Sequence, residues 1–236
     1  MDKLQFSYDT AYRENSSDMA STSLVEFFYD LKIKWVDKID WTSVLELGCG
    51  RGEITQILAA DFDLVYAVDF SIEALKKARK RITSSHVHFV YQDAVELGVQ
   101  QTFDVVFDSH LFHCLPFENS QKKILSHISK RMNLNGYFCL ETMVLGSTKY
   151  FAGPKFYLDS KGTLWKNNST QFSTHLPFRR LVESIELEKM VIDSGLEIVY
   201  MEVFPNKKFI LEGIYLDDCP DLCRMIIKKS HLSDLG

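Results

Sequence analysis

The sequence lacks long apolar runs. None of its 236 residues belong to a stretch approaching the roughly 20 apolar residues that a membrane-spanning helix needs. The first residues, MDKLQFSYDTAYREN, also lack the apolar core of a signal peptide. These absences predict a soluble, cytoplasmic protein with no membrane partner.

The sequence also has few cysteines and no excess of positive charge. Five cysteines at irregular positions do not fit a disulfide framework, which agrees with a reducing compartment. Lys and Arg number 27 against 32 acidic residues, a net charge of −5. Phosphate binding relies on clustered positive charge, so this composition argues against DNA as a partner. The 46% of apolar residues can bury a full core, and the length fits one domain.

Short apolar runs alternate with helical patterns in the first part of the chain. Continuous apolar strands separated by helices predict a mainly parallel sheet covered on both faces. A capping box is expected at Ser23, a helix cap at Ser71, and a helix stop at Asn135-Gly136. The expected strands are 44–47, 64–68, 87–91, 103–107 and 137–144, and the expected helices follow Ser23 and cover 53–60, 72–81 and 120–132.

The alternation stops after residue 145. Residues 145–180 are expected to be irregular. A helix at about 183–194 should end at Gly195, and the runs 197–204 and 208–215 predict an antiparallel hairpin at one sheet edge. The tail from Asp217 is expected to form a short helix starting at Pro220.

A glycine-rich loop lies between the first strand and its helix, where Gly48, Gly50 and Gly52 follow Glu46. Glycine allows a sharp turn and the close approach of a ligand. The spacing differs from the G-x-G-x-x-G of dinucleotide sites. An acid two residues before the loop would repel a pyrophosphate and attract a cationic group. The pattern therefore predicts a site for an adenosyl group with positive charge, although a plain strand–helix turn also fits.

Acids end the next two strands. Asp69 lies 21 residues after Gly48, where an acid can accept hydrogen bonds from both ribose hydroxyls. Asp93 ends the third strand and can accept from an adenine amino group. Either acid alone can also serve as a helix N-cap.

With these residues in place, the chain resembles a class I S-adenosylmethionine-dependent methyltransferase. The matching stretches are 44–52, 65–71, 91–94, 103–115 and 134–142, and with the hairpin the resemblance covers roughly residues 40–215. It implies a Rossmann-like α/β fold with seven mostly parallel strands, helices on both faces and an antiparallel terminal strand.

The resemblance also implies the cofactor, S-adenosylmethionine, and the product, S-adenosylhomocysteine. By this resemblance, the three glycines should pass along the cofactor. Glu46 should lie near the amino-acid end of the cofactor, and Asp69 should bind the ribose. Asp93 and Ala94 would frame the adenine. Phe70 and Asp108 are expected to complete the cofactor site.

The segment after the fourth strand carries the candidate catalytic residues, His110 and then His113. An imidazole is suited to accept a proton near neutral pH, if the methyl acceptor arrives protonated. Both histidines can instead be packing residues, and zinc on these histidines and Cys114 lacks a clear fourth ligand. No metal site is therefore expected. Glu141, late in the fifth strand, is either a polar substrate contact or a solvated strand end.

Two segments outside the resemblance are candidates for acceptor recognition. The N-terminal Tyr8, Tyr12 and Arg13 can form a lid over substrate and cofactor, or an ordinary packed arm. The insert 145–180 interleaves basic and aromatic residues, with Tyr157, Trp165 and Arg179 as candidate substrate contacts. It can close over an acceptor, form a docking surface, or present a solvated basic rim.

The leading prediction is a single-domain enzyme that methylates a small-molecule acceptor by in-line displacement. Its parts are an N-terminal lid and helix (1–40), a cofactor-binding half (41–144), a substrate cap (145–180), a helix with the edge hairpin (181–216) and a tail (217–236). A protein or RNA substrate, or a cofactor-binding module without catalysis, remain alternatives. The acceptor atom and the choice between a monomer and a homodimer stay open.

Overall fold

The computed structural model describes residues 9–10, 12–13, 22–35, 37–145, 156–166, 176–204, 210–211, 214–215 and 220–229. The main feature of this part of the chain is a seven-stranded sheet in the order β3-β2-β1-β4-β5-β12-β9. The first five strands are parallel, and β12 is antiparallel to both of its neighbours, β5 and β9. The predicted fold class is confirmed.

The elements follow the alternation read from the sequence. The strands of the large sheet are β1 (Ser43–Leu47), β2 (Leu64–Asp69), β3 (Val87–Tyr91), β4 (Phe103–Asp108), β5 (Met132–Val144), β9 (Leu196–Phe204) and β12 (Asp221–Lys229). The helices are α2 (Thr22–Trp35), α3 (Glu53–Leu58), α4 (Ile72–Arg81), α5 (Glu118–Arg131) and α6 (Ser184–Asp193), with 3₁₀ turns η1 (Ala94–Glu96) and η2 (Phe112–Cys114).

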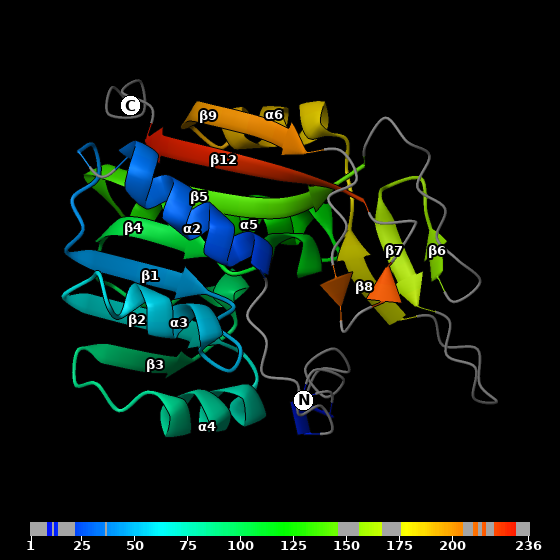
Figure 1. Ribbon diagram of the computed structural model, residues 1–236. Coiled ribbons are helices and arrows are strands. Elements are labelled where there is room, and N and C mark those ends of the chain that lie inside the picture. Colours follow the sequence, from blue (N-terminus) through cyan, green and yellow to red (C-terminus); the bar gives the residue numbers. More distant parts are fainter. Residues whose placement is uncertain are drawn as a thin grey trace.

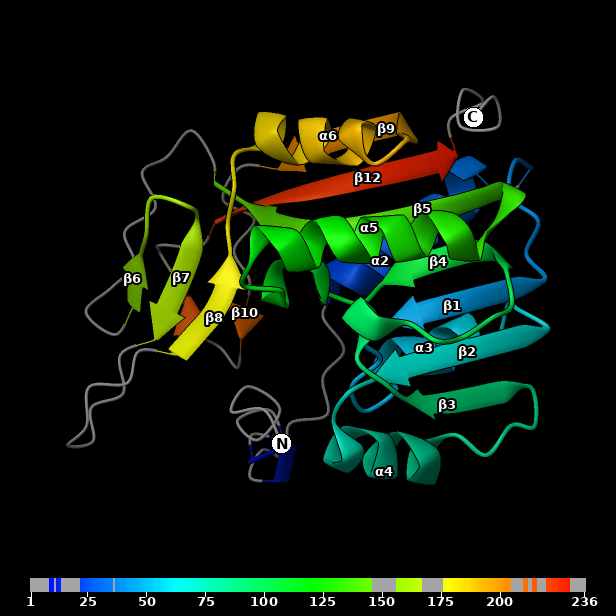
Figure 2. The same cartoon turned by 180° about the vertical axis from the view of Figure 1, so that it is seen from behind.

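Helices cover both faces of the sheet. Helices α2 and α3 lie on one face and α5 and α6 on the other, as the two opposite views show (Figures 1 and 2). Along β1, Val44 packs with the α2 and α3 side, whereas Leu45 and Leu47 pack with the α5 and α6 side. This alternation explains why the strand reads as a continuous apolar run: it is buried on both faces.

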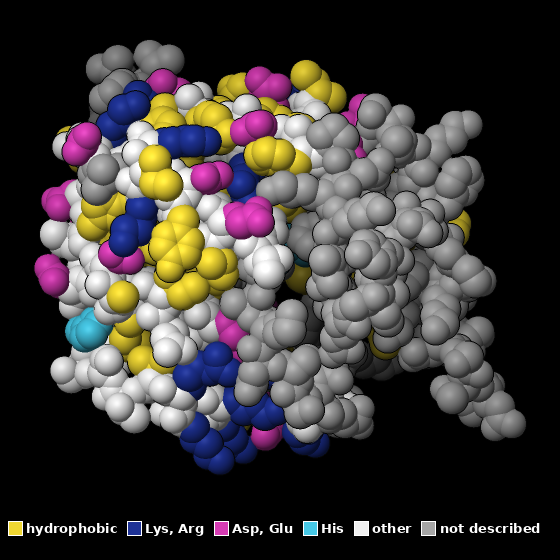
Figure 3. Space-filling view, viewed as in Figure 1, with side chains coloured by type: hydrophobic (Ala, Val, Ile, Leu, Met, Phe, Trp, Pro, Cys, Tyr) yellow, Lys and Arg dark blue, Asp and Glu magenta, His cyan; other side chains and the backbone are white. Residues whose placement is uncertain are grey.

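Helix α4 has the bounds that the sequence predicts. The Ser71 hydroxyl accepts the backbone N–H of Ala74 at 3.1 Å, which confirms the predicted cap. Ala74, Leu75 and Ala78 are buried, while Lys and Arg side chains gather on the outer surface over α4 (Figure 3). The chain therefore has a local basic surface despite its net negative charge.

The predicted cap at Ser23 is wrong, because α2 already begins at Thr22 and Ser23 lies in its first turn. The predicted helix stop at Asn135-Gly136 is also wrong. Helix α5 ends at Arg131, and β5 begins at Met132. A Cβ at Gly136 would lie 2.8 Å from the carbonyl oxygen of Phe103 on β4. Glycine is needed here for the close approach of two strands.

The predicted C-terminal elements need a larger correction. Residues 221–229 form β12, not a helix, and this strand lies between β5 and β9. It is buried from Asp221 to Ile227. The expected partner of β9, residues 208–215, instead contributes the two short strands β10 (Ile210–Leu211) and β11 (Ile214–Tyr215), which pair with each other. The charged Arg224 interrupts the apolar run of β12, and this hid the strand from sequence reasoning.

The insert 145–180 is not irregular throughout. Its described residues include β6 (Phe156–Leu158), β7 (Thr163–Lys166) and β8 (Leu176–Arg180), which form a three-stranded antiparallel sheet. The Thr163 hydroxyl donates to the carbonyl oxygen of Pro116, and the Arg180 guanidinium donates to the Gln121 side chain at 2.7 Å. These bonds attach the small sheet to the segment that starts α5 (Figure 2).

Candidate functional site

A cavity of about 490 Å³ opens where the carboxyl ends of the parallel strands meet. Gly48 after β1, Asp69 at the end of β2, Asp93 after β3 and His110 after β4 all line it. Ligands of open α/β sheets bind at this edge. The volume lies within the usual range for small-molecule sites, roughly 300–1,000 Å³.

The glycine loop forms one wall of the cavity. Gly48, Gly50 and Gly52 have φ angles of 74°, 54° and 82°, which favour glycine. A Cβ at Gly48 would lie 2.9 Å from the Leu111 Cβ, and a Cβ at Gly50 would lie 2.9 Å from the Tyr12 hydroxyl. Gly52 instead faces Ala78 of α4. Of the three glycines, Gly48 lines the cavity, and Gly50 lies next to Tyr12, which also lines it.

Asp69 links the loop to the second strand. One carboxylate oxygen accepts the backbone N–H of Gly50 and the other that of Ser71, both at 2.8 Å. Burial raises the pKa of Asp69 from 3.8 to about 6, although these hydrogen bonds act in the opposite direction. The side chain is 6% exposed and lines the cavity.

The end of β3 supplies the opposite wall. Asp93 and Ala94 line the cavity, as does Phe70 from the end of β2. One Asp93 oxygen also accepts the backbone N–H of Val95 at 2.9 Å, so this acid caps η1. The two interpretations of Asp93, as a cap and as a cavity residue, are therefore compatible.

Glu46 lies behind the wall rather than in it. Its side chain is fully buried and does not line the cavity. One oxygen accepts the hydroxyl of Thr55 at 2.5 Å, and the other accepts that of Ser109 at 2.7 Å. Burial raises the pKa of Glu46 from 4.5 to about 7, and the two hydroxyl hydrogen bonds oppose that rise.

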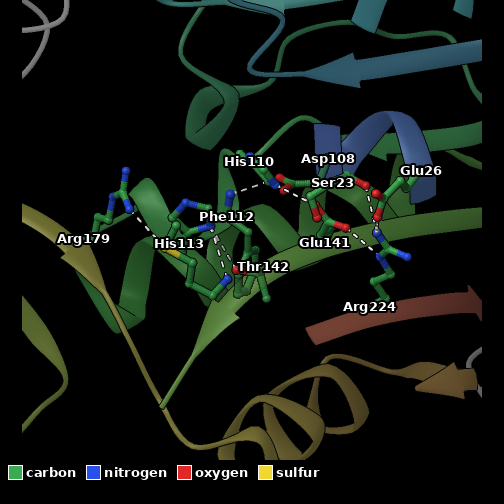
Figure 4. Close-up of polar contacts among 11 residues, drawn as sticks. Ser23, Glu26, Asp108, His110, Phe112, His113, Glu141, Thr142, Arg179 and Arg224 are labelled. Atoms are coloured by element: carbon green, nitrogen blue, oxygen red, sulfur yellow. Dashed lines mark hydrogen bonds and ion pairs between the residues drawn. The ribbon is translucent and has the colours of Figure 1, made fainter. Parts of the chain in front are cut away.

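His110 lines the cavity and is held by a buried acid. Its Nε2 atom lies 2.8 Å from Oε1 of Glu141, which is fully buried on β5 (Figure 4). The other Glu141 oxygen accepts from Nε of Arg224 on β12 at 2.6 Å. Glu141 is thus not a solvated strand end, and it does not line the cavity.

The backbone of His110 is strained. Its φ angle is 64°, and among the described residues it is the one non-glycine residue in this region. The Asp108 carboxylate accepts the backbone N–H of Phe112 at 3.0 Å across this turn. Such strain persists where the surroundings fix it, and it is typical of functional sites.

Comparison with known proteins agrees with this geometry. Residues 40–185, more than half of the chain, match a family model described as a methyltransferase domain. The chain belongs to the class I S-adenosylmethionine-dependent methyltransferases. S-adenosylmethionine is the cofactor of this family.

Among curated proteins, the methyltransferase is similar to the malonyl-[acyl-carrier protein] O-methyltransferase of Priestia megaterium. The two are 26% identical over 129 residues, which cover 54% of this chain and 46% of that protein. The methyltransferase therefore spans less than half the length of this relative. It is also 23% identical to nodulation protein S of Azorhizobium caulinodans over 95 residues, which cover 40% of this chain and 46% of that protein.

Two solved structures are similar over nearly the whole methyltransferase. The 1,6-didemethyltoxoflavin-N1-methyltransferase of Burkholderia thailandensis has a TM-score of 0.67 at 18% identity, covering 96% of this chain and 87% of that chain. The N-methyltransferase NodS of Bradyrhizobium japonicum has a TM-score of 0.66 at 14% identity, covering 97% and 99%. At these identities the likeness establishes a shared fold.

The second candidate histidine of the methyltransferase lies deeper than the first. His113 is 2% exposed and does not line the cavity. Burial, followed by the nearby charges of Arg179 and His110, holds its pKa well below 6.5. The backbone N–H of Met143 points to Nδ1 at 3.4 Å, while the two histidine rings lie 5.6 Å apart. His113 is therefore buried and neutral, and its ring lies next to that of His110.

Asp108 also lies beneath the cavity of the methyltransferase. It is 1% exposed, and burial raises its pKa well above 3.8 despite backbone hydrogen bonds from the following turn. Its Oδ2 atom has no hydrogen-bond partner in the described part of the chain. The geometry assigns Asp108 to the support of the His110 turn, not to the cavity surface.

The N-terminal segment contributes one cavity residue among those described. Tyr12 lines the cavity, and its carbonyl oxygen accepts from Lys77 of α4 at 2.5 Å. The Asp9 carboxylate accepts from the Ser71 hydroxyl at the start of α4. Arg13 is exposed and does not line the cavity, and Tyr8 lies outside the described residues.

The three candidate substrate contacts of the insert lie at different distances from the site. Trp165 donates to Asp159 at 2.9 Å, and its ring meets the edge of Phe117, a cavity residue, at 6.5 Å. Arg179 donates to the Met143 sulfur at 3.0 Å beside His113. Tyr157 is 55% exposed and does not line the cavity.

Sequence reasoning missed part of the cavity lining. Several of these residues lie within two positions of Asp69, Asp93 or His110, so their position near a strand end was the available signal. The set consists of Val68, Tyr91, Gln92, Val95, Ser109, Leu111, Leu115, Pro116, Phe117 and Ser120.

No group of three or more His, Cys, Asp or Glu side chains in the described residues is arranged to hold a metal ion. No helix among them combines the length and the apolar character that crossing a membrane would need.

Proposed function

We propose that the chain transfers a methyl group from S-adenosylmethionine to a small-molecule acceptor and releases S-adenosylhomocysteine. The observation that carries this proposal is that Asp69, the glycine loop and His110 meet in one cavity. When bound, S-adenosylmethionine supplies a methyl group on a positively charged sulfur. The chain's own task is then to hold the acceptor in line and to exclude water.

The residues of the cavity fit an adenosyl group. Each Asp69 oxygen accepts one backbone N–H, and a carboxylate offers about four lone-pair sites, so both oxygens can also accept a ribose hydroxyl. In this proposal Asp93, Ala94 and Phe70 frame the adenine, and Gly48 and Gly50 leave room that a Cβ would fill. Tyr12 covers the loop from the other side.

Glu46 contributes through the wall. It is buried and carries hydrogen bonds from Thr55 and Ser109, and Ser109 itself lines the cavity. A cationic ligand nearby favours the ionised form of a carboxyl group. We therefore assign Glu46 to the charged amino-acid end of the cofactor, acting at a distance and without direct contact.

His110 is the proposed catalytic residue. It is the histidine that lines the cavity, whereas His113 is enclosed by β5 and η2. We propose His113, Trp165 and Arg179 as residues that shape the acceptor side, and residues 145–180 as a cap of the same single domain. The small-molecule acceptor is supported by the similar fold of the 1,6-didemethyltoxoflavin-N1-methyltransferase.

A second candidate is an acceptor carried by a protein. The named activity of the Priestia megaterium relative, on malonyl-[acyl-carrier protein], favours this alternative. In that case the insert would be a docking surface for the carrier and not only a cap.

The test is incubation of the chain with methyl-labelled S-adenosylmethionine and an extract of the source cells, separated by size. Label that appears only with the chain, in the small-molecule fraction, supports the proposal and directs mass spectrometry to the acceptor. Label in protein favours the carrier alternative, and label in RNA contradicts both. Calorimetric binding of S-adenosylhomocysteine without any transfer would indicate a cofactor-binding module.

A further inference from the structure

Glu141 joins three elements through buried polar contacts. Its Oε1 atom lies 2.8 Å from Nε2 of His110, after β4, and its Oε2 atom accepts from Nε of Arg224, on β12, at 2.6 Å (Figure 4). The carboxylate itself is fully buried, while the His110 side chain is 19% exposed. Of these three residues, only His110 lines the cavity.

Burial of an unpaired ionised carboxylate is costly, so the partners of Glu141 determine whether it is ionised. Burial by itself raises the pKa of Glu141, but the hydrogen bond and the charge of His110, together with the hydrogen bond from Arg224, lower it below 4.5. Glu141 is therefore ionised at neutral pH. The His110 imidazole therefore lies 2.8 Å from a buried negative charge.

Arg224 keeps that charge in place from the other side. It is 3% exposed, and its Nη2 atom donates to the backbone carbonyl of Ser23 in α2 at 2.8 Å, while Nη1 lies 3.3 Å from Asp30. The rings of Phe27 and Phe204 lie 5.2 and 5.0 Å from its guanidinium carbon. Arg224 is thus held independently of Glu141, and the carboxylate has two fixed partners.

We propose that Glu141 and Arg224 are positioning residues that hold His110 as a proton acceptor, so that the chain methylates an oxygen or nitrogen that must lose a hydrogen. This inference rests on the proposed methyl transfer. Because Nε2 faces Glu141, the neutral ring carries its hydrogen on Nε2, and Nδ1 is the atom that takes the proton.

In the proposed transfer, one proton and one methyl group move. The acceptor's O–H or N–H bond breaks, and its proton goes to Nδ1 of His110, which becomes an imidazolium beside the Glu141 carboxylate. The acceptor's electron pair forms the new bond to the methyl carbon, and the pair from the broken carbon–sulfur bond stays on the sulfur. A carboxylate acceptor has no proton to lose and gains nothing from this arrangement.

Several other titratable groups lie around His110. His113, in η2, lies 5.6 Å away between ring centres and is neutral. Asp108, at the end of β4, is buried with a raised pKa. On the far side of His113, Arg179 of β8 adds a positive charge. Of these groups, Glu141 makes the direct contact with the imidazole, at 2.8 Å.

The first test reads the histidine directly. Long-range ¹H–¹⁵N NMR of the full chain should show that the neutral His110 ring carries its hydrogen on Nε2. The His110 signal is identified as the one that disappears in His110→Gln. Glu141→Gln should change this pattern to a mixture of the two neutral forms. An unchanged His110 signal in Glu141→Gln would overturn the positioning role, and this readout needs no acceptor.

The second test uses the acceptor found by labelling. Glu141→Gln should lower kcat at least about tenfold, because the imidazolium that forms during the transfer loses its carboxylate partner. Glu141→Asp should recover part of the rate. A product that is a methyl ester of a carboxylate would overturn the acceptor class.

Two controls separate this inference from the proposed function and from misfolding. S-adenosylhomocysteine should bind to Glu141→Gln as tightly as it binds to the unaltered chain. If it binds to neither protein, the proposed function itself is contradicted. Glu186→Gln changes another carboxylate–arginine contact, that of the half-exposed Glu186 with the buried Arg180 at 2.7 Å, and should leave kcat unchanged. If Glu141→Gln fails to fold, Glu141→Gln with Arg224→Gln removes both buried charges and should give the same NMR pattern.

Discussion

The Asp69 carboxylate accepts the backbone N–H of Gly50 at 2.8 Å, so the acid that ends β2 fixes the conformation of the loop that follows β1. The same carboxylate faces the cavity. Loop geometry and ligand contact are therefore coupled through one side chain, and a change in Asp69 acts on both.

Asp69→Asn should weaken the binding of S-adenosylhomocysteine by about 1–3 kcal/mol, roughly 5- to 150-fold, because ribose hydroxyls lose a charged acceptor. The amide can keep one backbone N–H contact, which limits damage to the loop. Calorimetry gives the affinity. Asp63→Asn, at an exposed position before β2, is the matched control and should bind normally. Equal affinities in both variants would contradict the ribose assignment.

The same affinity should depend on pH. Burial raises the pKa of Asp69 to about 6, and the ionised form is the better acceptor for the ribose. Lowering the pH through about 6 should therefore weaken S-adenosylhomocysteine binding in the unaltered chain. The dependence should vanish in Asp69→Asn, and its persistence there would assign it to another group.

Glu46 should make the folded state less stable as pH rises. Its folded-state pKa of about 7 exceeds the ordinary 4.5, so between these values the folded chain binds more protons than the unfolded chain. The free energy of unfolding should fall by up to about 3 kcal/mol across this interval. Glu46→Gln should flatten the slope in urea titrations, whereas Glu183→Gln, at an exposed position, should keep it.

Gly50→Ala tests the space in the loop. The φ angles of Gly50 and Gly195 are 54° and 75°, so alanine at either position should cost about 1–2 kcal/mol of stability. Only at Gly50 does the new methyl group meet a neighbour, the Tyr12 hydroxyl at 2.9 Å, whereas nothing lies within 4 Å at Gly195. S-adenosylhomocysteine affinity should therefore fall in Gly50→Ala alone. Loss of affinity in Gly195→Ala would point to general destabilisation.

Substitutions at Tyr12 and Asp9 test whether the N-terminal segment covers the cavity or only packs against the domain. Tyr12→Ala should weaken cofactor binding more than it lowers the melting temperature, because Tyr12 lines the cavity. Asp9→Ala removes the contact with Ser71 and should mainly lower the melting temperature. Similar losses of both quantities in the two variants would favour the packing interpretation for the whole segment.

The cofactor half could be predicted from sequence because its signals are local. Helix α4 and strand β3 have the predicted bounds, and Asp69 and Gly48 lie where strand-end patterns predict them. These features depend on periodicity and on residues close in sequence.

The rest depends on contacts between distant residues, which single-sequence patterns do not contain. Arg224 and Glu141 are 83 residues apart. The sequence alone leaves Glu141 as either a polar substrate contact or a solvated strand end, and it gives no sign of its pairing with Arg224. Strand β12 was missed because Arg224 interrupts its apolar run, and the buried partner of that charge, Glu141, is distant in sequence. Gly136 was read as a helix stop, because its real neighbour, the Phe103 carbonyl group, is also distant in sequence.

The place of β12 sets an order of assembly. This strand is the last of the sheet to leave the ribosome, yet it fills an interior position between β5 and β9. Until residues 221–229 are synthesised, β5 exposes an unpaired edge and Glu141 lacks Arg224. The chain therefore completes its sheet and its candidate proton-accepting site in one late step, and a nascent chain halted before β12 has neither.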